Sequence, residues 1–84
     1  YHALLTLKTP EECYQFFLDL CTQAEMKAME QRFDVAKMLR SGSIYHDILT
    51  ETSASSATIS RVNRSLLNGS GGYEMVFSRL EEKK

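Results

Sequence analysis

The stretch from Ile44 to Leu67, IYHDILTETSASSATISRVNRSLL, constrains the fold more than any other part of the chain. Its apolar residues recur at helical spacing on both sides of a short polar segment, Thr52 to Ser55. We therefore predict a short helix over about 44–52, a tight turn, and a second helix that ends near Asn68. Ser53 stands where such a turn often carries glycine. Two helices joined in this way, here over about 44–68, form a helix-turn-helix, whose second helix enters the DNA major groove.

The second helix of this pair has one apolar face, because Ile59, Val62 and Leu66 follow the i, i+3, i+7 spacing of a core-facing stripe. The residues expected to face outward or flank that face are small, polar or basic: Ala57, Thr58, Ser60, Arg61, Arg64, Ser65 and Asn68. Small side chains allow close approach to base edges, and arginines suit phosphates or guanine. Ser55 or Ser56 can cap the helix and leave its first N–H groups free for a phosphate. An ordinary solvated helix would have a similar composition, so that interpretation stays open.

The first helix of the pair is expected to direct Ile44, Ile48 and Leu49 toward the core. Tyr45 and His46 then lie on its outer side. His46 has no cysteine or histidine at ligand spacing around it, so we interpret it as a surface or phosphate-contacting residue and predict no metal site.

The segment Thr9-Pro10-Glu11-Glu12 has the order of a helix start: an N-cap, a proline, and two acids near the positive end of the dipole. It predicts a helix over about Pro10–Cys21. Apolar residues cover most of the circumference of this helix: Cys13, Tyr14, Phe16, Phe17, Leu18, Leu20 and Cys21. Such a helix must be covered on more than one side, and in so short a chain a second subunit is the expected cover. Tyr1–Lys8 is expected to be a frayed helix or the end of a longer one.

Thr22 and Glu25 form a predicted capping box for a helix that runs to about Arg40 and ends at Ser41-Gly42-Ser43. Apolar residues of this helix fall in two stripes: Met26, Met29, Phe33 and Ala36 in one, and Ala28, Val35 and Leu39 in the other. Two stripes again suggest two packing partners. Arg32 falls between them, which favours an ion pair at an interface over a position lining a cavity.

The segment from Asn68 to Gly72 is glycine-rich and predicts a flexible break, with Gly69 as a C-cap. The last helix is expected over about Tyr73–Glu82. Four of its residues share one face and should pack on the body or on a partner subunit: Tyr73, Val76, Phe77 and Leu80. Glu81 to Lys84 is a charged end that we expect to be frayed.

The bulk properties fit one small globular domain spanning 1–84, because 43% of the 84 residues are hydrophobic and 25% are charged. The net charge is only −1, but it is unevenly distributed. Acids outnumber bases from Glu11 to Asp34, whereas Ser53 to Asn68 carries only Arg61 and Arg64, and a local basic patch is enough to steer DNA. No apolar run is long enough for a membrane span and no signal peptide is visible. Cys13 and Cys21 are expected to be buried free thiols in a reducing cytoplasm.

The stretch RFDVAKMLRSGSIYHDILTETSASSATISRVNRSL resembles the tryptophan repressor superfamily, and in particular its YerC/YecD-type, TrpR-like branch. The likeness covers most of the chain and is most specific at ATISRVNRSL. It implies an all-α, TrpR-like helical bundle with one helix-turn-helix per subunit, in an intertwined homodimer. It also implies sequence-specific operator binding through residues of both helices: Tyr45, His46, Ser55, Ser56, Ala57, Thr58 and Ser60.

The resemblance further implies a possible effector pocket. In the tryptophan repressor, a Thr and an Arg before the helix-turn-helix and an Arg and a Ser within the recognition helix hold the corepressor. Four residues here fall at matching places if the loop at 41–43 is one residue shorter: Thr22, Arg32, Arg61 and Ser65. However, the indole of the corepressor lies against a glycine that is Val62 here. A branched side chain would fill the space of the indole, so we expect no tryptophan corepressor and no other cofactor.

The leading hypothesis is a cytoplasmic, dimeric transcriptional regulator, a repressor, that binds a palindromic operator in double-stranded DNA independently of tryptophan. The alternative is a helical dimerisation or protein-interaction module of a transcription complex. An enzyme is not expected, because the sequence contains no recognisable nucleophile–base pair, carboxylate dyad, phosphate-binding loop or metal cluster.

Overall fold

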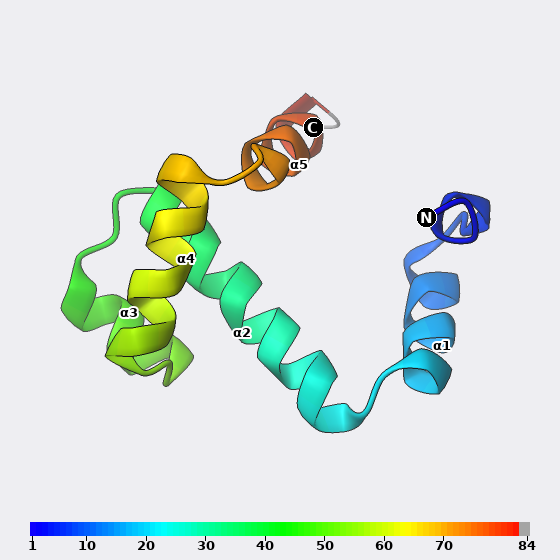
Figure 1. Ribbon diagram of the computed structural model, residues 1–84, viewed down its shortest axis with the longest axis horizontal. Coiled ribbons are helices and arrows are strands. Elements are labelled where there is room, and N and C mark those ends of the chain that lie inside the picture. The colour runs from blue at the N-terminus through cyan, green and yellow to red at the C-terminus, as the bar shows by residue number, and fades with distance from the viewer. Residues whose placement is uncertain (83–84) are drawn as a thin grey trace. The chain divides into compact units, whose positions relative to one another are not determined.

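A computed structural model of the chain describes residues 1–82, and every regular element within them is a helix (Figure 1). The elements are a 3-10 helix η1 (Leu4–Thr6) and the α-helices α1 (Pro10–Leu20), α2 (Gln23–Arg40), α3 (Tyr45–Thr52), α4 (Ser56–Asn68) and α5 (Gly72–Glu82). The predicted all-α fold is therefore confirmed, and each predicted helix is present. Lys83 and Lys84, the last part of the predicted charged end, lie outside the described residues. No helix within 1–82 has the length and apolar character needed to cross a membrane.

The starts of α1 and α2 are fixed by the caps that the sequence predicts. Thr9 Oγ1 accepts a hydrogen bond from the Glu12 N–H at 3.1 Å. Thr22 and Glu25 form the reciprocal pair of a capping box, because the Thr22 N–H donates to the Glu25 carboxylate at 2.8 Å and the Glu25 N–H donates to Thr22 Oγ1 at 3.1 Å. These bonds to Thr22 lower the pKa of Glu25 below its ordinary value.

The chain divides into two compact units, residues 1–30 and residues from 31 onward, and α2 contributes to both. Within residues 1–30 no side chain is buried. Tyr14, Leu18 and Leu20 on α1 are 59%, 46% and 61% exposed. Cys13 and Cys21 are free thiols, as expected, but they are half-buried, and the prediction that they are buried is wrong for the isolated chain. The first unit alone offers too few apolar neighbours to cover them.

The second unit contains a small apolar core that joins four helices and one turn. Its buried members are Val35 and Ala36 of α2, Ile48 of α3, Ala54 of the turn, Ile59 and Val62 of α4, and Phe77 of α5. The predicted core-facing stripe of α4 is confirmed, since Ile59 and Val62 are buried and Leu66 packs against the cluster. The part of α2 that enters this core is its C-terminal half.

Ile44 departs from prediction, because it is 64% exposed rather than core-facing. It is the N-cap of α3 with extended backbone (φ −76°, ψ 154°), so it lies outside the helix whose face it was assigned to. The predicted face of α5 is only partly used. Phe77 is buried, whereas Val76 and Leu80 remain 42% and 50% exposed in the single chain.

Arg40 at the C-terminal end of α2 anchors α5 through ion pairs. Its Nε and Nη2 donate to the two carboxylate oxygens of Glu74, each at 2.9 Å, and its Nη1 donates to Glu81. The guanidinium carbon also lies 5.3 Å from the centroid of the Phe77 ring, which in turn stacks on Phe33 at 5.2 Å. The fork of an arginine suits this bidentate contact, which fixes orientation as well as position.

This anchor predicts a pH-dependent stability. The Arg40 hydrogen bonds lower the pKa of Glu74 from its ordinary 4.5 to about 2. A lowered pKa in the folded state means that the contribution is fully present above pH 4.5 and is lost as the pH falls through about 2. We expect the wild-type melting temperature to exceed that of Glu74→Gln at neutral pH, and the difference to vanish at the acid end.

Thermal unfolding followed by circular dichroism across this range measures the difference, with Glu82→Gln as a control at an exposed position of the same helix. Equal melting temperatures for wild type and Glu74→Gln at neutral pH would contradict the prediction.

Candidate nucleic-acid interface

The turn between α3 and α4 is built without glycine. Thr52 is the last residue of α3, and Ser53 follows in the left-handed region (φ 56°, ψ 18°) with its N–H donating to the Leu49 carbonyl at 3.1 Å. Residues other than glycine, asparagine and aspartate rarely adopt this conformation, which costs about 1 kcal/mol. Ser53 therefore takes the conformation that the common glycine would take, and the predicted turn is present.

Thr52 braces this turn with its hydroxyl group. Its Oγ1 donates to the Ile48 carbonyl at 2.6 Å and accepts from the Ala54 N–H at 3.2 Å, so one side chain bonds the backbone on both sides of Ser53. The methyl group of Ala54 is buried in the core, with 3% of the residue exposed. The turn is thus held by the burial of Ala54 in the core and by the two hydrogen bonds of the Thr52 hydroxyl group.

Ser55 is the N-cap of α4, which decides between the two candidate serines. Its Oγ accepts from the Thr58 N–H at 3.1 Å and donates to Thr58 Oγ1 at 3.1 Å. The N–H groups of Ser56 and Ala57 form no hydrogen bond within residues 1–82. The helix start therefore keeps two free donors at the positive end of its dipole, where an anion is favoured.

The residues predicted to meet DNA are nearly all exposed, on two consecutive helices that share one core (Figure 1). The exposed ones are Tyr45, His46, Ser55, Ser56, Ala57, Ser60, Arg61 and Arg64. Thr58 is half-buried. Neither Arg61 nor Arg64 forms an ion pair within the described part of the chain, so both charges are available to a ligand. In these residues no cluster of His, Cys, Asp or Glu could hold a metal ion.

Three of the four predicted effector residues belong to the second unit: Arg32, Arg61 and Ser65. Thr22 belongs to the first unit and its hydroxyl is engaged in the capping box. Arg32 is half-buried on α2 and has no ion-pair partner among residues 1–82, so its predicted ion pair at an interface with a second subunit stays a prediction. Arg61 is exposed. Ser65 lines the groove described next, and the lining of that groove does not include Arg32 or Arg61.

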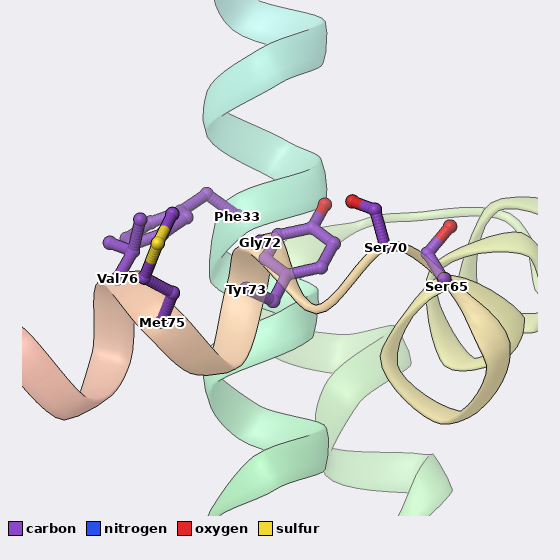
Figure 2. A pocket seen from close by; sticks show the side chains of 8 residues that line it. Phe33, Ser65, Ser70, Gly72, Tyr73, Met75 and Val76 are labelled. Atoms are coloured by element: carbon purple, nitrogen blue, oxygen red, sulfur yellow. The ribbon is translucent and has the colours of Figure 1, made fainter.

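A groove of about 500 Å³ lies where the end of α4 and the start of α5 meet α2 (Figure 2). Its lining is Phe33, Ser65, Gly69, Ser70, Gly72, Tyr73, Met75 and Val76. In the view of Figure 2, Tyr73 lies between the apolar side chains of Met75 and Val76 and the hydroxyl groups of Ser65 and Ser70. This groove was not predicted from the sequence, because residues 68–72 were interpreted only as a flexible break. The aromatic residue directly after the glycines was the signal available.

Gly69 is the C-cap of α4, as predicted, but it is not in a left-handed conformation (φ −85°, ψ −160°). Glycine is needed there because a Cβ atom would clash with the Ser65 carbonyl oxygen, to which the Gly69 N–H donates at 3.0 Å.

Comparison with known proteins identifies the class. An all-helical fold of this kind is shared by solved TrpR-like proteins, and the Trp repressor family is a family of DNA-binding regulators that are not enzymes. The chain belongs to the Trp repressor protein family, whose sequence profile matches residues 1–81. The predicted resemblance is therefore confirmed, as is the expectation that the chain is not an enzyme.

Individual relatives agree in sequence and in fold. The uncharacterized protein YerC of Bacillus subtilis (strain 168) is 54% identical over 82 residues, which are 98% of this chain and 79% of YerC. A Staphylococcus aureus protein proposed to be a Trp repressor is 51% identical with a TM-score of 0.91, over 95% of this chain and 80% of that one. A TrpR-like protein of Eubacterium eligens ATCC 27750 is 55% identical with a TM-score of 0.91, over 95% of this chain and 82% of that one.

The two serines at the start of α4 provide a matched test of this local structure. Ser55→Ala removes the cap on the Thr58 N–H and should lower the free energy of unfolding by about 1 kcal/mol. Ser56→Ala removes an exposed hydroxyl group with no partner within 1–82 and should change it by less than about 0.5 kcal/mol. Urea unfolding without DNA measures both. Equal losses would mean that the Ser55 hydroxyl group does not stabilise α4.

Proposed function

We propose that the protein is a sequence-specific DNA-binding transcriptional regulator, a repressor, in which α3 and α4 form a helix-turn-helix and α4 reads the major groove. The observation that carries this proposal is the surface of α4: small, polar and basic side chains, unpaired arginines, and a helix start with two free N–H donors. Membership of a family of DNA-binding regulators supports it independently.

The proposed contacts divide by chemistry. Ser55, Ser56 and the free N–H groups at the start of α4 are proposed to meet phosphates. Tyr45 and His46 of α3 are proposed to assist this contact. Ala57, Thr58 and Ser60 approach base edges. Since Thr58 Oγ1 already accepts from Ser55, its own hydroxyl proton is left to donate to an acceptor on a base. Arg61 and Arg64 contact phosphates or guanine.

The functional molecule is proposed to be a homodimer that binds a palindrome. The support is the exposure of large apolar side chains in residues 1–30, where Tyr14 and Leu20 are 59% and 61% exposed and nothing is buried. A second copy would bury these side chains and present two recognition helices about one helical turn of DNA apart. In this proposal residues 1–84 act as one domain of an intertwined dimer, and the protein acts in the cytoplasm, where it reaches DNA.

DNA binding is proposed not to require tryptophan. Val62, which stands where the tryptophan repressor has a glycine against the indole, is 2% exposed and belongs to the core. The groove lined by Ser65 lacks Arg32 and Arg61, the two cations proposed for a corepressor carboxylate. A different effector that uses Thr22, Arg32, Arg61 and Ser65 across the dimer stays part of the proposal.

Selection of bound sequences from a random duplex library tests the function. We expect enrichment of a palindrome without tryptophan, at low and at near-physiological salt. Enrichment only with tryptophan would show that Val62 does not close the site. No enrichment under any condition would contradict the proposed function and favour the alternative, a protein-interaction module of a transcription complex.

Arg64 offers a quantitative test against the enriched duplex. Each phosphate contact adds about 0.9 to the slope of log K against log salt. Arg64→Ala should therefore weaken binding at low salt and reduce this slope by about 1, as expected for one lost phosphate contact. Arg79→Ala, which removes an exposed arginine of α5, is the matched control and should leave the slope unchanged. Fluorescence anisotropy over a salt series measures both, and an unchanged slope for Arg64→Ala would exclude the phosphate contact.

A further inference from the structure

A hydrogen bond from Gln31 links α2 to the end of α3. The Gln31 Nε2 group donates to the carbonyl oxygen of Thr52 at 3.1 Å, across 21 residues of sequence, and both residues are half-buried. Thr52 is the last residue of α3 and directly precedes the turn into α4. Of the hydrogen bonds found within residues 1–82, this one alone joins α2 to that turn.

The bond completes the hydrogen bonding of Thr52. The carbonyl groups in the last turn of a helix have no partner within the helix, and a half-buried one is poorly supplied by water. The Thr52 hydroxyl already bonds the backbone of Ile48 and Ala54, and Gln31 supplies the donor for the Thr52 carbonyl. Both polar groups of the peptide between Thr52 and Ser53 are thereby bonded: its carbonyl accepts from Gln31, and its N–H donates to the Leu49 carbonyl.

The apolar contacts beneath the turn cannot fix its orientation alone. Ile48 at 0%, Ala54 at 3% and Ile59 at 3% exposure fix how closely the turn sits on the core. Such contacts are non-directional, whereas a hydrogen bond weakens steeply when its angle departs from linearity. A small shift of the turn relative to α2 would change these apolar contacts little but would strain the bond between Gln31 and the Thr52 carbonyl.

We propose that Gln31 is a positioning residue for the recognition surface: its bond to the Thr52 carbonyl sets the orientation of the turn, and through it that of α4. Base-edge contacts require side chains held within about 0.5 Å and 10–20° of the productive geometry. Phosphate contacts by long, flexible arginines tolerate larger errors. Gln31 therefore acts on discrimination between DNA sequences more than on affinity for DNA in general. The inference rests on the proposed function.

Three substitutions separate positioning from mere packing. Gln31→Met keeps a side chain of similar length but removes the donor. Gln31→Lys restores a donor of comparable reach. Gln23→Met makes the first change at an exposed position of the same helix, where the glutamine forms no side-chain hydrogen bond within 1–82.

The DNA measurement is the ratio of Kd values for the enriched duplex and a scrambled duplex of equal composition. Gln31→Met should reduce this specificity ratio by about five- to tenfold, the scale of one lost hydrogen bond, and leave the scrambled-duplex Kd unchanged. Gln31→Lys should recover the ratio, and Gln23→Met should match wild type. A parallel loss for both duplexes, or an unchanged ratio, would overturn the inference.

Amide hydrogen exchange of Ser53 and Ala54 without DNA tests the structural step separately. Both amide protons are hydrogen-bonded in the turn. They should exchange faster in Gln31→Met, by about five- to tenfold if the bond is lost, and return toward the wild-type rate in Gln31→Lys. Unchanged exchange in Gln31→Met would overturn the inference whatever the DNA result. If wild type binds no DNA, the proposed function fails, and faster exchange would still establish that Gln31 orients the turn.

Discussion

The small apolar core of the second unit is the constraint on which the other features depend. Val35 and Ala36 of α2 are fully buried, and they form one apolar cluster with residues of α3, the turn, α4 and α5. With so few buried side chains there is little excess stability, and a polar or enlarged residue among them would be costly. Because α4 packs on the core through its other face, the side chains on its exposed face do not contribute to this packing and can serve to bind a ligand.

The core does not fix the orientation of its helices precisely. Hydrogen bonds and ion pairs at the ends of helices do so. Thr52 and Ser55 bond the backbone on either side of the turn, and Arg40 grips Glu74 and Glu81 of α5. Each contact sets a rotation or an angle that apolar packing leaves loosely defined. Residues 1–30 have caps of the same kind but no buried side chain, so their stability in isolation rests on little else.

A feature could be predicted from the sequence when the residues that form it lie close together along the chain. Helix starts at Thr9 and Thr22, and the buried stripe of Ile59 and Val62, depend on neighbours within one or two turns, and all were predicted correctly. The contacts that were missed join distant positions: Gln31 with Thr52 is separated by 21 residues, and Arg40 with Glu74 by 34. Ile44 was wrongly predicted to face the core, because helical periodicity does not show at which residue the helix begins. The groove beside Tyr73 arises from three segments, and the aromatic residue after the glycines is its one local signal in the sequence.

The construction of the turn sets different rules for substitution at three adjacent positions during evolution. At 53 the backbone conformation decides, so glycine, asparagine and aspartate are the natural replacements for serine, and β-branched residues are excluded. At 52 a hydroxyl group is required, so serine is the closest substitute for threonine. At 54 the space is closed, and alanine is the largest side chain that fits without repacking. Substitutions should therefore be tolerated on the exposed face of α4, where, under the proposed function, they would change the DNA sequence that is bound. The three turn residues that orient α4 should vary only within these narrow sets.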